Sequence, residues 1–234
     1  MNNELIYSGK AKDLFKTENE DELLVVYKDQ ATALNGKRKE IFPGKGTLNC
    51  QIATLVFDYL IKNGIKTHVI KNVSDHEQLI KKTEVIPLEV VLRNRVSGSL
   101  ARKFDLIEGE TLEKPIIEFY FKSDKLDDPF INDSQVLALG IATQDEIDYV
   151  KDQALAVNNL LVKFFADKNL DLIDFKLEFG RLNDEIILVD EFSPDNCRLW
   201  DQTSHNSLDK DIFRQKKGDL VETYQKVLDR LTAE

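Results

Sequence analysis

Two β-favouring segments joined by a short polar turn constrain this chain more than any other feature of its sequence. The first is LIDFKLEFG at positions 172–180, and the second is the apolar run Ile186–Val189. Because successive side chains of a strand point to opposite faces, Asp174, Lys176 and Glu178 share one face, and the apolar residues between them share the other. From the first segment alone, a half-buried strand with a solvated polar face is an equally good interpretation.

The second segment weighs against a solvated face. Ile186–Val189 is too apolar for a solvated edge strand, and it ends abruptly at Asp190. If the two segments form a hairpin closed by residues 183–185, Glu178 lies opposite Asp190. Two opposed carboxylates repel unless a cation lies between them, and Mg²⁺, held by one or two carboxylates together with phosphate oxygens, is the natural candidate. Lys176 on the same face is then placed to meet a transferring phosphoryl group or a substrate carboxylate.

The remaining pattern predicts an α+β chain. Short strand-like runs fill the first 30 residues, and a stripe of apolar residues with helical spacing covers 48–60. Two further amphipathic helices are predicted, at 143–164, which opens with the capping-box sequence TQDE, and at 219–231. Strands cluster early and helices fall mainly later, which is typical of antiparallel sheets with flanking helices. A boundary before Ile86-Pro87 divides the chain into a β-rich lobe, residues 1–84, and an α+β lobe, residues 85–234.

Composition narrows the classes of function. The formal net charge of −10 argues against a nucleic-acid binder, which needs a basic face, but it leaves small phosphorylated ligands open. No segment approaches the roughly 20 apolar residues that span a bilayer, and the N-terminus lacks the pattern of a signal peptide. We therefore expect no membrane contact and a cytoplasmic location. Cys50, Cys197 and the 3 histidines match no metal or redox pattern, and we interpret them as structural or solvated.

A second polar constellation follows a predicted strand in the middle of the chain. The sequence PLEVVLRNRVSGSLAR, positions 87–102, runs from an apolar strand into Arg93 and then into a tight turn that ends at Ser99. Ser99 is predicted to N-cap a short helix, and a helix start beside arginines suits a phosphate group. The alternative is a surface turn whose arginines form salt bridges.

Two glycine-containing turns carry weaker signals. YSGKAK at 7–12 places a glycine and two lysines between early strands, as in loops that cover nucleotide phosphates, although such turns are also common on surfaces. The segment PGKGT at 43–47 fails the P-loop pattern, because Gly46 follows the lysine where Ser or Thr is required, so its role as a cationic helix start stays open. The loop DEFSPDNCRLWD at 190–201 begins at the proposed metal ligand, which favours a site over an ordinary polar loop.

Taken together, these segments resemble the SAICAR synthetase family in its short, single-function bacterial form. The resemblance covers nearly the whole chain, through YSGKAK at 7–12, IPLE at 86–89, RNR at 93–95, DFKLEFG at 174–180, DEFSPD at 190–195 and RLWD at 198–201. The order and spacing of DFKLEFG and DEFSPD make it highly specific. Ser97 departs from the Ala or Thr that is more usual in the family, a small change that leaves the Ser99 assignment standing.

The resemblance implies an enzyme of de novo purine biosynthesis. Members of the family are ADP-forming carbon–nitrogen ligases. They use ATP and Mg²⁺ to join L-aspartate to the carboxylate of the ribotide CAIR, and they release SAICAR, ADP and phosphate. The resemblance also implies a kinase-like or ATP-grasp-like nucleotide cleft between two lobes, and a homo-oligomer that is most often a dimer.

Individual residues receive roles from the same resemblance. Contacts with the nucleotide are implied for the turn Gly9, Lys10, Ala11 and Lys12 at the phosphates, and for the segment Lys82–Val85 at adenine. Glu178 and Asp190 would hold Mg²⁺, and the ribotide phosphate would be bound by Arg93, Ser99 and Arg198. A place near the reacting carboxylate and the amino acid is implied for Lys176, Lys122, Asp128, Asp195 and Arg214.

The residues and the resemblance agree on the chemistry. A carboxylate is a poor acyl donor, and phosphorylating it creates a leaving group that an amine displaces. The sequence contains no Ser/His/Asp or Cys/His set for a covalent acyl-enzyme. Two rival classes remain. A small-molecule kinase would release ADP with the ribotide but without aspartate, and a nucleotide-binding regulator would bind ATP without turnover, although the charged set at Lys176, Glu178 and Asp190 argues against a regulator.

Overall fold

The early β-favouring segments form a five-stranded antiparallel sheet. In the computed structural model, which describes residues 4–33 and 38–233, this sheet has the strand order β1-β2-β3-β7-β6. Its strands are β1 Leu5–Ser8, β2 Lys12–Lys16, β3 Glu22–Tyr27, β6 Val69–Asn72 and β7 Glu77–Lys81. A separate two-stranded ribbon pairs β4 Gln30–Ala33 with β5 Arg38–Ile41.

A larger sheet of seven strands is built around one long strand, β12 Leu170–Leu182. The N-terminal part of β12 pairs with β9 and β14, whereas its C-terminal part, from Glu178 onward, pairs with β13 and β8. The other strands of this sheet are β8 Glu84–Val85, β9 Leu88–Arg95, β10 Thr111–Phe121, β11 Phe130–Ile131, β13 Glu185–Val189 and β14 Cys197–Asp201. β12 therefore changes its neighbours at the positions where its charged residues lie.

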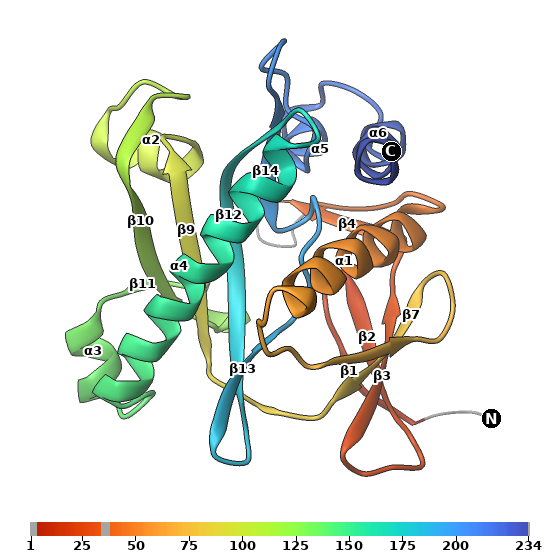
Figure 1. The fold of residues 1–234 in the computed structure, drawn as a ribbon, viewed down its shortest axis with the longest axis vertical. Helices are drawn as coiled ribbons and strands as arrows, with labels where there is room; N and C mark the ends of the chain where they lie inside the picture. Colours follow the sequence, from red (N-terminus) through yellow and green to blue (C-terminus); the bar gives the residue numbers. More distant parts are fainter. Residues whose placement is uncertain (1–3, 34–37, 234) are drawn as a thin grey trace.

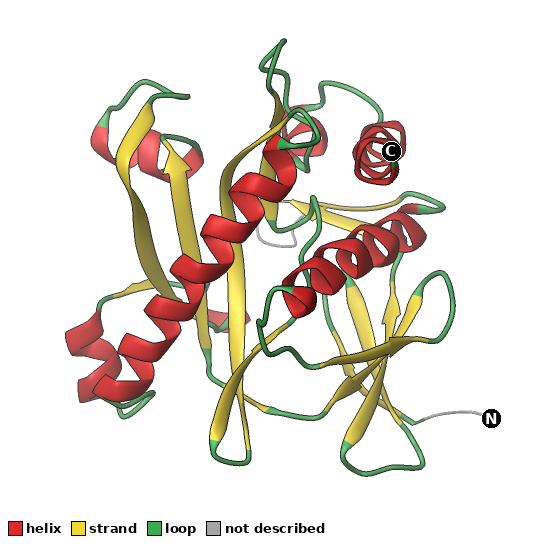
Figure 2. Cartoon of the chain, in the orientation of Figure 1, coloured by secondary structure: helices red, strands yellow, loops and turns green. Residues whose placement is uncertain are grey.

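Three long helices cover the sheets, and shorter helical segments connect the strands. Figures 1 and 2 show α4 crossing in front of β9 and β12, while α1 lies beside the five-stranded sheet with α6 near its end. α1 packs against α6, and α4 packs against β12. The helical segments are α1 Lys45–Lys62, α2 Gly98–Phe104, the 3₁₀ turn Asp124–Leu126, α3 Asp133–Ala138, α4 Gln144–Ala166, α5 Asp211–Gln215 and α6 Leu220–Thr232.

Apolar side chains from both sheets join in one continuous core. It contains Val25 and Ile80 from the five-stranded sheet together with Phe175 from β12. The Phe192 ring packs against Phe165 and Phe175, with ring centroids 5.7 Å and 5.5 Å away. The loop that follows β13 is therefore anchored in the core, and it is not the ordinary polar loop that was the alternative from sequence.

The predicted α+β class and the three long helices are confirmed. The capping box of α4 is also confirmed, because Thr143 accepts a hydrogen bond from the Glu146 backbone N–H and the Glu146 carboxylate accepts one from the Thr143 N–H. The expectation that strands cluster early is wrong, since all seven strands of the larger sheet begin at residue 84 or later.

The register of the β12–β13 hairpin differs by one residue from the prediction. Glu178 pairs with Val189, and Leu182 pairs with Glu185, so only residues 183–184 form the turn. Asn183 has a φ of 54°, a left-handed conformation that suits a tight two-residue hairpin turn. Asp190 consequently follows the last strand residue instead of pairing within the strand, and its own φ is 67°.

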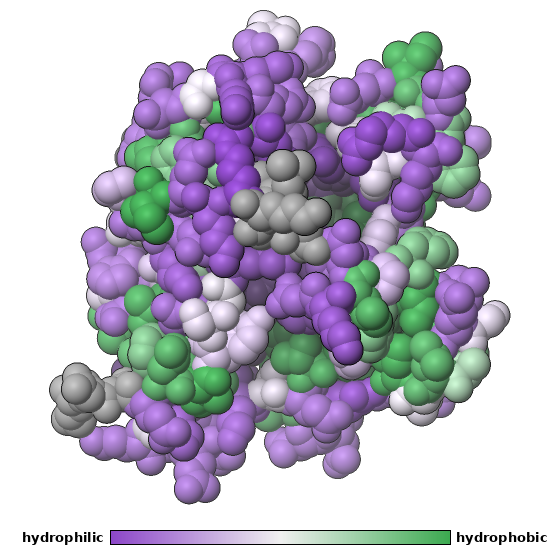
Figure 3. All heavy atoms as spheres, turned by 180° about the vertical axis from the view of Figure 1, so that it is seen from behind, coloured by the Kyte–Doolittle hydropathy of each residue, from purple (hydrophilic) through white to green (hydrophobic). Residues whose placement is uncertain are grey.

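The molecular surface is largely hydrophilic on the face opposite α1 and α4. Figure 3 shows this face, where hydrophilic residues predominate and hydrophobic residues form separate patches. Among the described helices, none is long and apolar enough to cross a membrane.

Candidate active site

A cavity of about 450 Å³ lies where residues of the two sheets face one another. One wall is apolar and comes from the five-stranded sheet, with Leu14, Val25 and Ile80. The opposite wall carries charged side chains from β9, β12 and the segment after β10. The charged and turn residues of the lining include Gly9, Lys10, Ala11, Lys12, Glu89, Lys122, Asp124, Asp128, Lys176, Glu178, Asp190 and Glu191. The structure thus gathers most of the sequence-predicted nucleotide and catalytic residues around one space.

The turn between β1 and β2 forms one edge of the cavity. The Gly9 N–H donates to the Lys12 carbonyl over 2.8 Å, which closes the turn tightly. A Cβ at Gly9 would lie 3.1 Å from the Tyr7 ring and 3.2 Å from the Lys12 carbonyl oxygen. A larger residue at this position would therefore press on the Tyr7 ring and on the Lys12 carbonyl of this close turn.

Lys176 lies at the centre of the charged wall. Its Nζ is 2.6 Å from Glu178 Oε1, 3.1 Å from Asp190 Oδ2 and 3.4 Å from Glu89 Oε1. Lys12 also donates to Asp190, and Lys122 donates to Glu178. Glu178 and Asp190 do converge, as predicted, but the cation between them in this structure is the Lys176 ammonium.

The paired charges shift one another's pKa values. Burial disfavours the charge on Asp190, but the ammonium groups of Lys12, Lys176 and Lys122 outweigh it and hold the pKa of Asp190 well below its usual range. Burial likewise opposes the charge on Lys176, yet Asp190, Glu178 and Glu89 raise its pKa well above the ordinary value. Both groups are therefore charged at neutral pH.

A second group of charges lines the mouth of the cavity. Lys10 Nζ lies 2.7 Å from Asp124 Oδ1 and 4.0 Å from Asp128 Oδ2. Asp128 also accepts a hydrogen bond from the Ser123 backbone N–H over 2.8 Å. The segment after β10 is thereby connected to the turn between β1 and β2.

The expected adenine segment lies partly at the cavity. Thr83 and Val85 line it, but the exposed Lys82 does not. The Lys82 backbone N–H donates to the Asp21 carbonyl over 2.8 Å and is not free for a base. The backbone donor of Lys82 is therefore occupied by the preceding loop, and the assignment of Lys82–Val85 to adenine stays a prediction.

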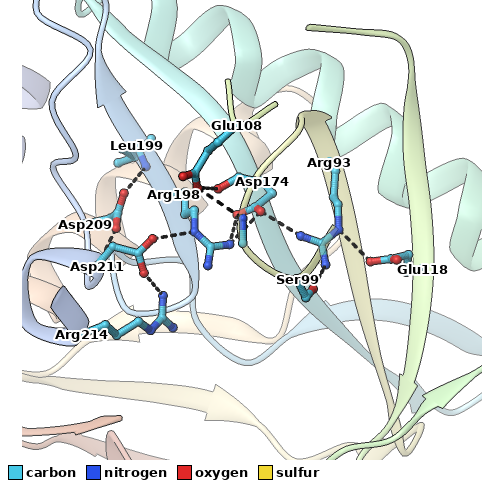
Figure 4. A network of polar contacts seen from close by, with 12 residues as sticks. Arg93, Ser99, Glu108, Glu118, Asp174, Arg198, Leu199, Asp209, Asp211 and Arg214 are labelled. Atoms are coloured by element: carbon cyan, nitrogen blue, oxygen red, sulfur yellow. Dashed lines mark hydrogen bonds and ion pairs between the residues drawn. The ribbon is translucent and has the colours of Figure 1, made fainter. Parts of the chain in front are cut away.

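Arginines and acidic residues form a separate network near the other end of β12 (Figure 4). Arg93 contacts Asp174 Oδ2 at 3.0 Å, Glu118 Oε2 at 2.7 Å and Ser99 Oγ at 2.9 Å. Arg198 donates from Nη1 to both oxygens of Asp174, at 3.0 Å and 2.8 Å. The three residues predicted to bind the ribotide phosphate are therefore neighbours around Asp174.

The helix start in this network differs from the prediction. α2 begins at Gly98, its N-cap residue is Ser97, and Ser99 lies inside the helix with its hydroxyl accepting from Arg93. Gly98 has a φ of 55°, and a Cβ there would lie 2.6 Å from Arg198 Nη2. Glycine thus leaves room for the Arg198 guanidinium.

Arg214 and Asp195 lie outside the lining of the cavity, and their places near the substrates stay predictions. Arg214 Nη1 contacts Asp211 Oδ1 at 2.6 Å, and Asp211 in turn holds Arg198 Nε at 2.8 Å, so Arg214 belongs to the arginine network. Asp195 is buried away from the cavity lining, where it accepts hydrogen bonds from Lys45, Asn49 and Tyr224.

The contacts of Asp195 explain both its position and the unassigned PGKGT segment. Lys45 and Asn49 belong to α1, and Tyr224 belongs to α6, so one carboxylate joins two helices to the loop after β13. Burial opposes its charge, but Lys210 and Lys45 hold its pKa below the usual range. The cation at the start of α1 therefore serves an internal ion pair.

β12 connects the cavity to the arginine network. Asp174, Lys176 and Glu178 alternate along it and share one face. Asp174 holds the arginines, Glu178 lies in the cavity, and Lys176 lies between them. Asp174 and Glu178 are four residues apart, which corresponds to roughly 13 Å along a strand.

Comparison with known proteins agrees with this arrangement. The family model described as SAICAR synthetase matches residues 5–231. The chain belongs to the SAICAR synthetase family. A relative from Latilactobacillus sakei subsp. sakei, a phosphoribosylaminoimidazole-succinocarboxamide synthase, is 60% identical over 232 residues, which cover 99% of this chain and 96% of the relative.

Solved structures of SAICAR synthetases share the fold. The phosphoribosylaminoimidazole-succinocarboxamide synthase of Ehrlichia chaffeensis superposes with a TM-score of 0.96 at 41% identity, covering 99% of both chains. A SAICAR synthetase in complex with ADP superposes with a TM-score of 0.94 at 46% identity, covering 97% of both chains. These matches give no support to the small-molecule kinase considered from the sequence.

Several residues of this SAICAR synthetase site were missed by reasoning from the sequence. Glu89 and Glu191 line the cavity, and Asp174 and Asp211 hold the arginines. Glu89 and Asp174 could have been found, because each lies on a predicted strand at an alternate position from an assigned residue. Asp211 carries no such signal, since only the folded chain brings it to Arg198.

The carboxylates of the cavity form an incomplete metal site. Across the described ranges, 4–33 and 38–233, no three His, Cys, Asp or Glu side chains are grouped so that they could hold a metal ion by themselves. Glu178 and Asp190 nevertheless both reach Lys176 Nζ, so their oxygens can approach one cation. Such a pair fits Mg²⁺, which is commonly held by one or two carboxylates with water and phosphate oxygens completing its shell.

Proposed function

We infer that this protein is an ATP-dependent ligase of purine biosynthesis that joins L-aspartate to the carboxylate of CAIR and yields SAICAR, ADP and phosphate. The observation that best supports this function is the alternation of three charged residues, Asp174, Lys176 and Glu178, along one face of β12. An arginine network suited to a phosphate lies at Asp174, a lysine follows at Lys176, and a cavity suited to a nucleotide lies at Glu178.

The cavity is proposed to bind ATP. Its apolar wall, with Val85 at one end, suits a purine ring, and Gly9, Ala11 and the lysines at positions 10 and 12 suit the phosphates. The related SAICAR synthetase that was solved in complex with ADP supports the binding of an adenine nucleotide.

Mg²⁺ is proposed to bind with the nucleotide at Glu178 and Asp190. Three lysines of the cavity already form ion pairs with three carboxylates, so the cavity has little unpaired positive charge for a polyphosphate. The lysines are Lys12, Lys122 and Lys176, and the carboxylates are Glu89, Glu178 and Asp190. A divalent cation bound between phosphate and carboxylate oxygens would supply that charge. When bound, it would neutralise charge on the phosphoryl group that is transferred.

The ribotide phosphate is proposed to bind at Arg93, Ser99 and Arg198. Planar guanidinium groups recognise phosphate with paired hydrogen bonds. Asp174 holds both guanidinium groups in place and neutralises part of their charge before the ligand arrives. Arg214, whose side chain is 41% exposed, is proposed to face a substrate carboxylate at the same end.

The reaction is proposed to pass through an acyl phosphate. A ribotide anchored at the arginines directs its carboxylate along β12 toward Lys176. There the carboxylate oxygen attacks the γ-phosphorus of ATP, ADP leaves, and the amine of aspartate then displaces phosphate from the acyl carbon. Lys176 and Lys122 are placed to stabilise the negative charge that develops on the transferring group, and Asp128 lies at the mouth of the same cavity.

The assembly and location are proposed from the resemblance. A division into lobes 1–84 and 85–234 is supported in outline by the two main sheets, because the smaller one ends at Lys81 and the larger one begins with β8, at the proposed boundary. A homodimer is proposed from the family, and light scattering of the purified protein tests it. A cytoplasmic location is supported by Cys50 and Cys197, which are both free thiols.

The function is tested by reconstitution. Purified protein is mixed with ATP, Mg²⁺, CAIR and L-aspartate, and the products are separated by liquid chromatography and mass spectrometry. We expect SAICAR and ADP in equal amounts, and no SAICAR when aspartate is omitted. Steady ADP release with CAIR alone would instead identify a kinase.

A further inference from the structure

Glu191 is a buried residue whose carboxyl oxygen Oε2 has no partner in the described structure. It is 6% exposed, it lines the cavity, and its Oε2 is buried without a hydrogen-bond partner. Within residues 4–33 and 38–233, its side chain makes no hydrogen bond or ion pair. An unsatisfied buried carboxyl is costly, so its presence at a ligand cavity calls for a partner that arrives later.

Lys12 is the cation that faces this carboxyl group. Burial raises the pKa of Glu191, and the charge of Lys12 is the strongest influence that opposes this rise. In the other direction, Glu191 acts on Lys12 second only to Asp190 among the charges. In this structure, however, the Lys12 ammonium donates to Asp190 instead.

The neighbouring carboxylates already have partners. Glu178 accepts from Lys122 and Lys176, and Asp195 accepts from Lys45 and Asn49. Asp190 is shared between Lys12 and Lys176. If Asp190 turns to a cation bound with the nucleotide, Lys12 loses its partner, and Glu191 is the cavity carboxylate left to receive it.

We propose that Glu191 is a positioning residue, which accepts the ammonium group of Lys12 when Asp190 engages the cation that accompanies the nucleotide. The proposal rests on the proposed binding of Mg²⁺ at Asp190. Lys12 is thereby kept at the phosphates with its charge held by a carboxylate behind it. The exchange leaves every member of the group paired in the loaded site, including the carboxyl group that is unsatisfied before loading.

A matched pair of substitutions tests this exchange. Glu191→Gln removes a carboxylate that has no partner in the unliganded protein, so we expect the melting temperature without ligand to stay the same or rise. Glu146→Gln removes a carboxylate that Arg181 holds at 2.5 Å and that does not line the cavity, so we expect a lower melting temperature and unchanged nucleotide affinity. A positioning residue changes nucleotide affinity without lowering the melting temperature, whereas a purely structural residue lowers the melting temperature without changing nucleotide affinity.

Nucleotide affinity supplies the decisive measurement, by calorimetry with ADP in Mg²⁺ and with ADP in EDTA. In Mg²⁺ we expect Glu191→Gln to weaken ADP binding by about tenfold, the effect of losing one charge-assisted hydrogen bond. In EDTA, where Asp190 keeps Lys12, we expect no loss. A bystander carboxylate would behave differently, since removing a negative charge would strengthen phosphate binding under both conditions.

The proposal requires that Glu191 affects ADP affinity through Lys12. In a Lys12→Met background, Glu191→Gln is expected to cause no further loss of affinity for Mg²⁺ and ADP. An equal loss in both backgrounds, or unchanged affinity of the single variant in Mg²⁺, would overturn the proposal. If Mg²⁺ fails to strengthen ADP binding even in the unaltered protein, the metal assignment at Asp190 is wrong, which is a different outcome.

Discussion

At the scale of single residues, the site is defined by Lys176 and the carboxylates around it. Three carboxylates lie within 3.4 Å of its Nζ, and two of them belong to the proposed metal ligands Glu178 and Asp190. The sequence could predict that these carboxylates converge, because alternation along a strand is a local property. It could not predict that the Lys176 ammonium would lie between them, since that depends on how side chains from β9, β12 and the residue after β13 meet in the folded chain.

Replacing Lys176 tests both of its roles. Lys176→Met removes a donor at the transferring group, and we expect turnover to fall by about 10²–10³-fold. It also removes the cation that lies between Glu178 and Asp190, so Mg²⁺ alone should raise the melting temperature of this variant more than that of the unaltered protein. Calorimetric scans with and without Mg²⁺ measure the difference. Equal shifts in the two proteins would contradict a shared metal site at these carboxylates.

At the scale of secondary-structure elements, prediction succeeded where the signal was local. The capping box of α4 and the apolar stripe of α1 are readable within a few residues. The strand β10 was missed because its residues are mostly half-exposed or exposed, it contains Pro115, and its pairing with β9 is irregular before Ile116. The partners of Asp195 could not be predicted either, because Lys45 lies 150 residues away along the chain.

The start of α4 gives a prediction for pH dependence. The hydrogen bond from Arg181, aided by the Thr143 backbone N–H, lowers the pKa of Glu146 from 4.5 to about 2. A carboxyl whose folded pKa is depressed contributes stability above its unfolded pKa and loses that contribution as the pH falls through the folded value. Glu146→Gln should therefore destabilise the protein at pH 7, and the difference from the unaltered protein should shrink between pH 4.5 and about pH 2.

Urea unfolding at a series of pH values measures this difference. Thr143→Ala is the companion variant, and it is expected to cost about 1 kcal/mol through the lost cap, with much less dependence on pH. A Glu146→Gln effect that stays constant down to the acid limit would show that the Arg181 pair contributes nothing to stability.

At the scale of the whole molecule, the two sheets meet where the chain passes from β7 to β9 alongside β12. Gly180 makes this passage possible. A Cβ at Gly180 would lie 2.7 Å from Thr83 Oγ1 and 2.9 Å from Thr83 Cβ, so the segment before Ile86 would have to move. Thr83 and Val85 also line the cavity, so this contact couples the junction of the sheets to the nucleotide site.

Gly180→Ala is expected to destabilise the protein by about 1–3 kcal/mol through overpacking, and to weaken ADP binding at the same time. Gly218→Ala is the matched control, because its nearest neighbour would lie at an ordinary 3.4 Å. Adding Thr83→Gly to Gly180→Ala removes the clashing atoms and should restore part of both losses. Urea unfolding measures the loss of stability, and calorimetry measures the loss of ADP affinity. Unchanged stability and affinity in Gly180→Ala would show that the junction accommodates the methyl group freely.

In the proposed reaction, the ribotide carboxylate, anchored by the arginines at Asp174, attacks the γ-phosphate of ATP beside Lys176. Isotope transfer tests it most directly. CAIR labelled with ¹⁸O in its carboxylate is converted with ATP, Mg²⁺ and aspartate, and each product is examined by mass spectrometry. We expect one label in inorganic phosphate for each SAICAR formed, and none in the nucleotide. Label in AMP, with pyrophosphate among the products, would show attack at the α-phosphorus and contradict this site.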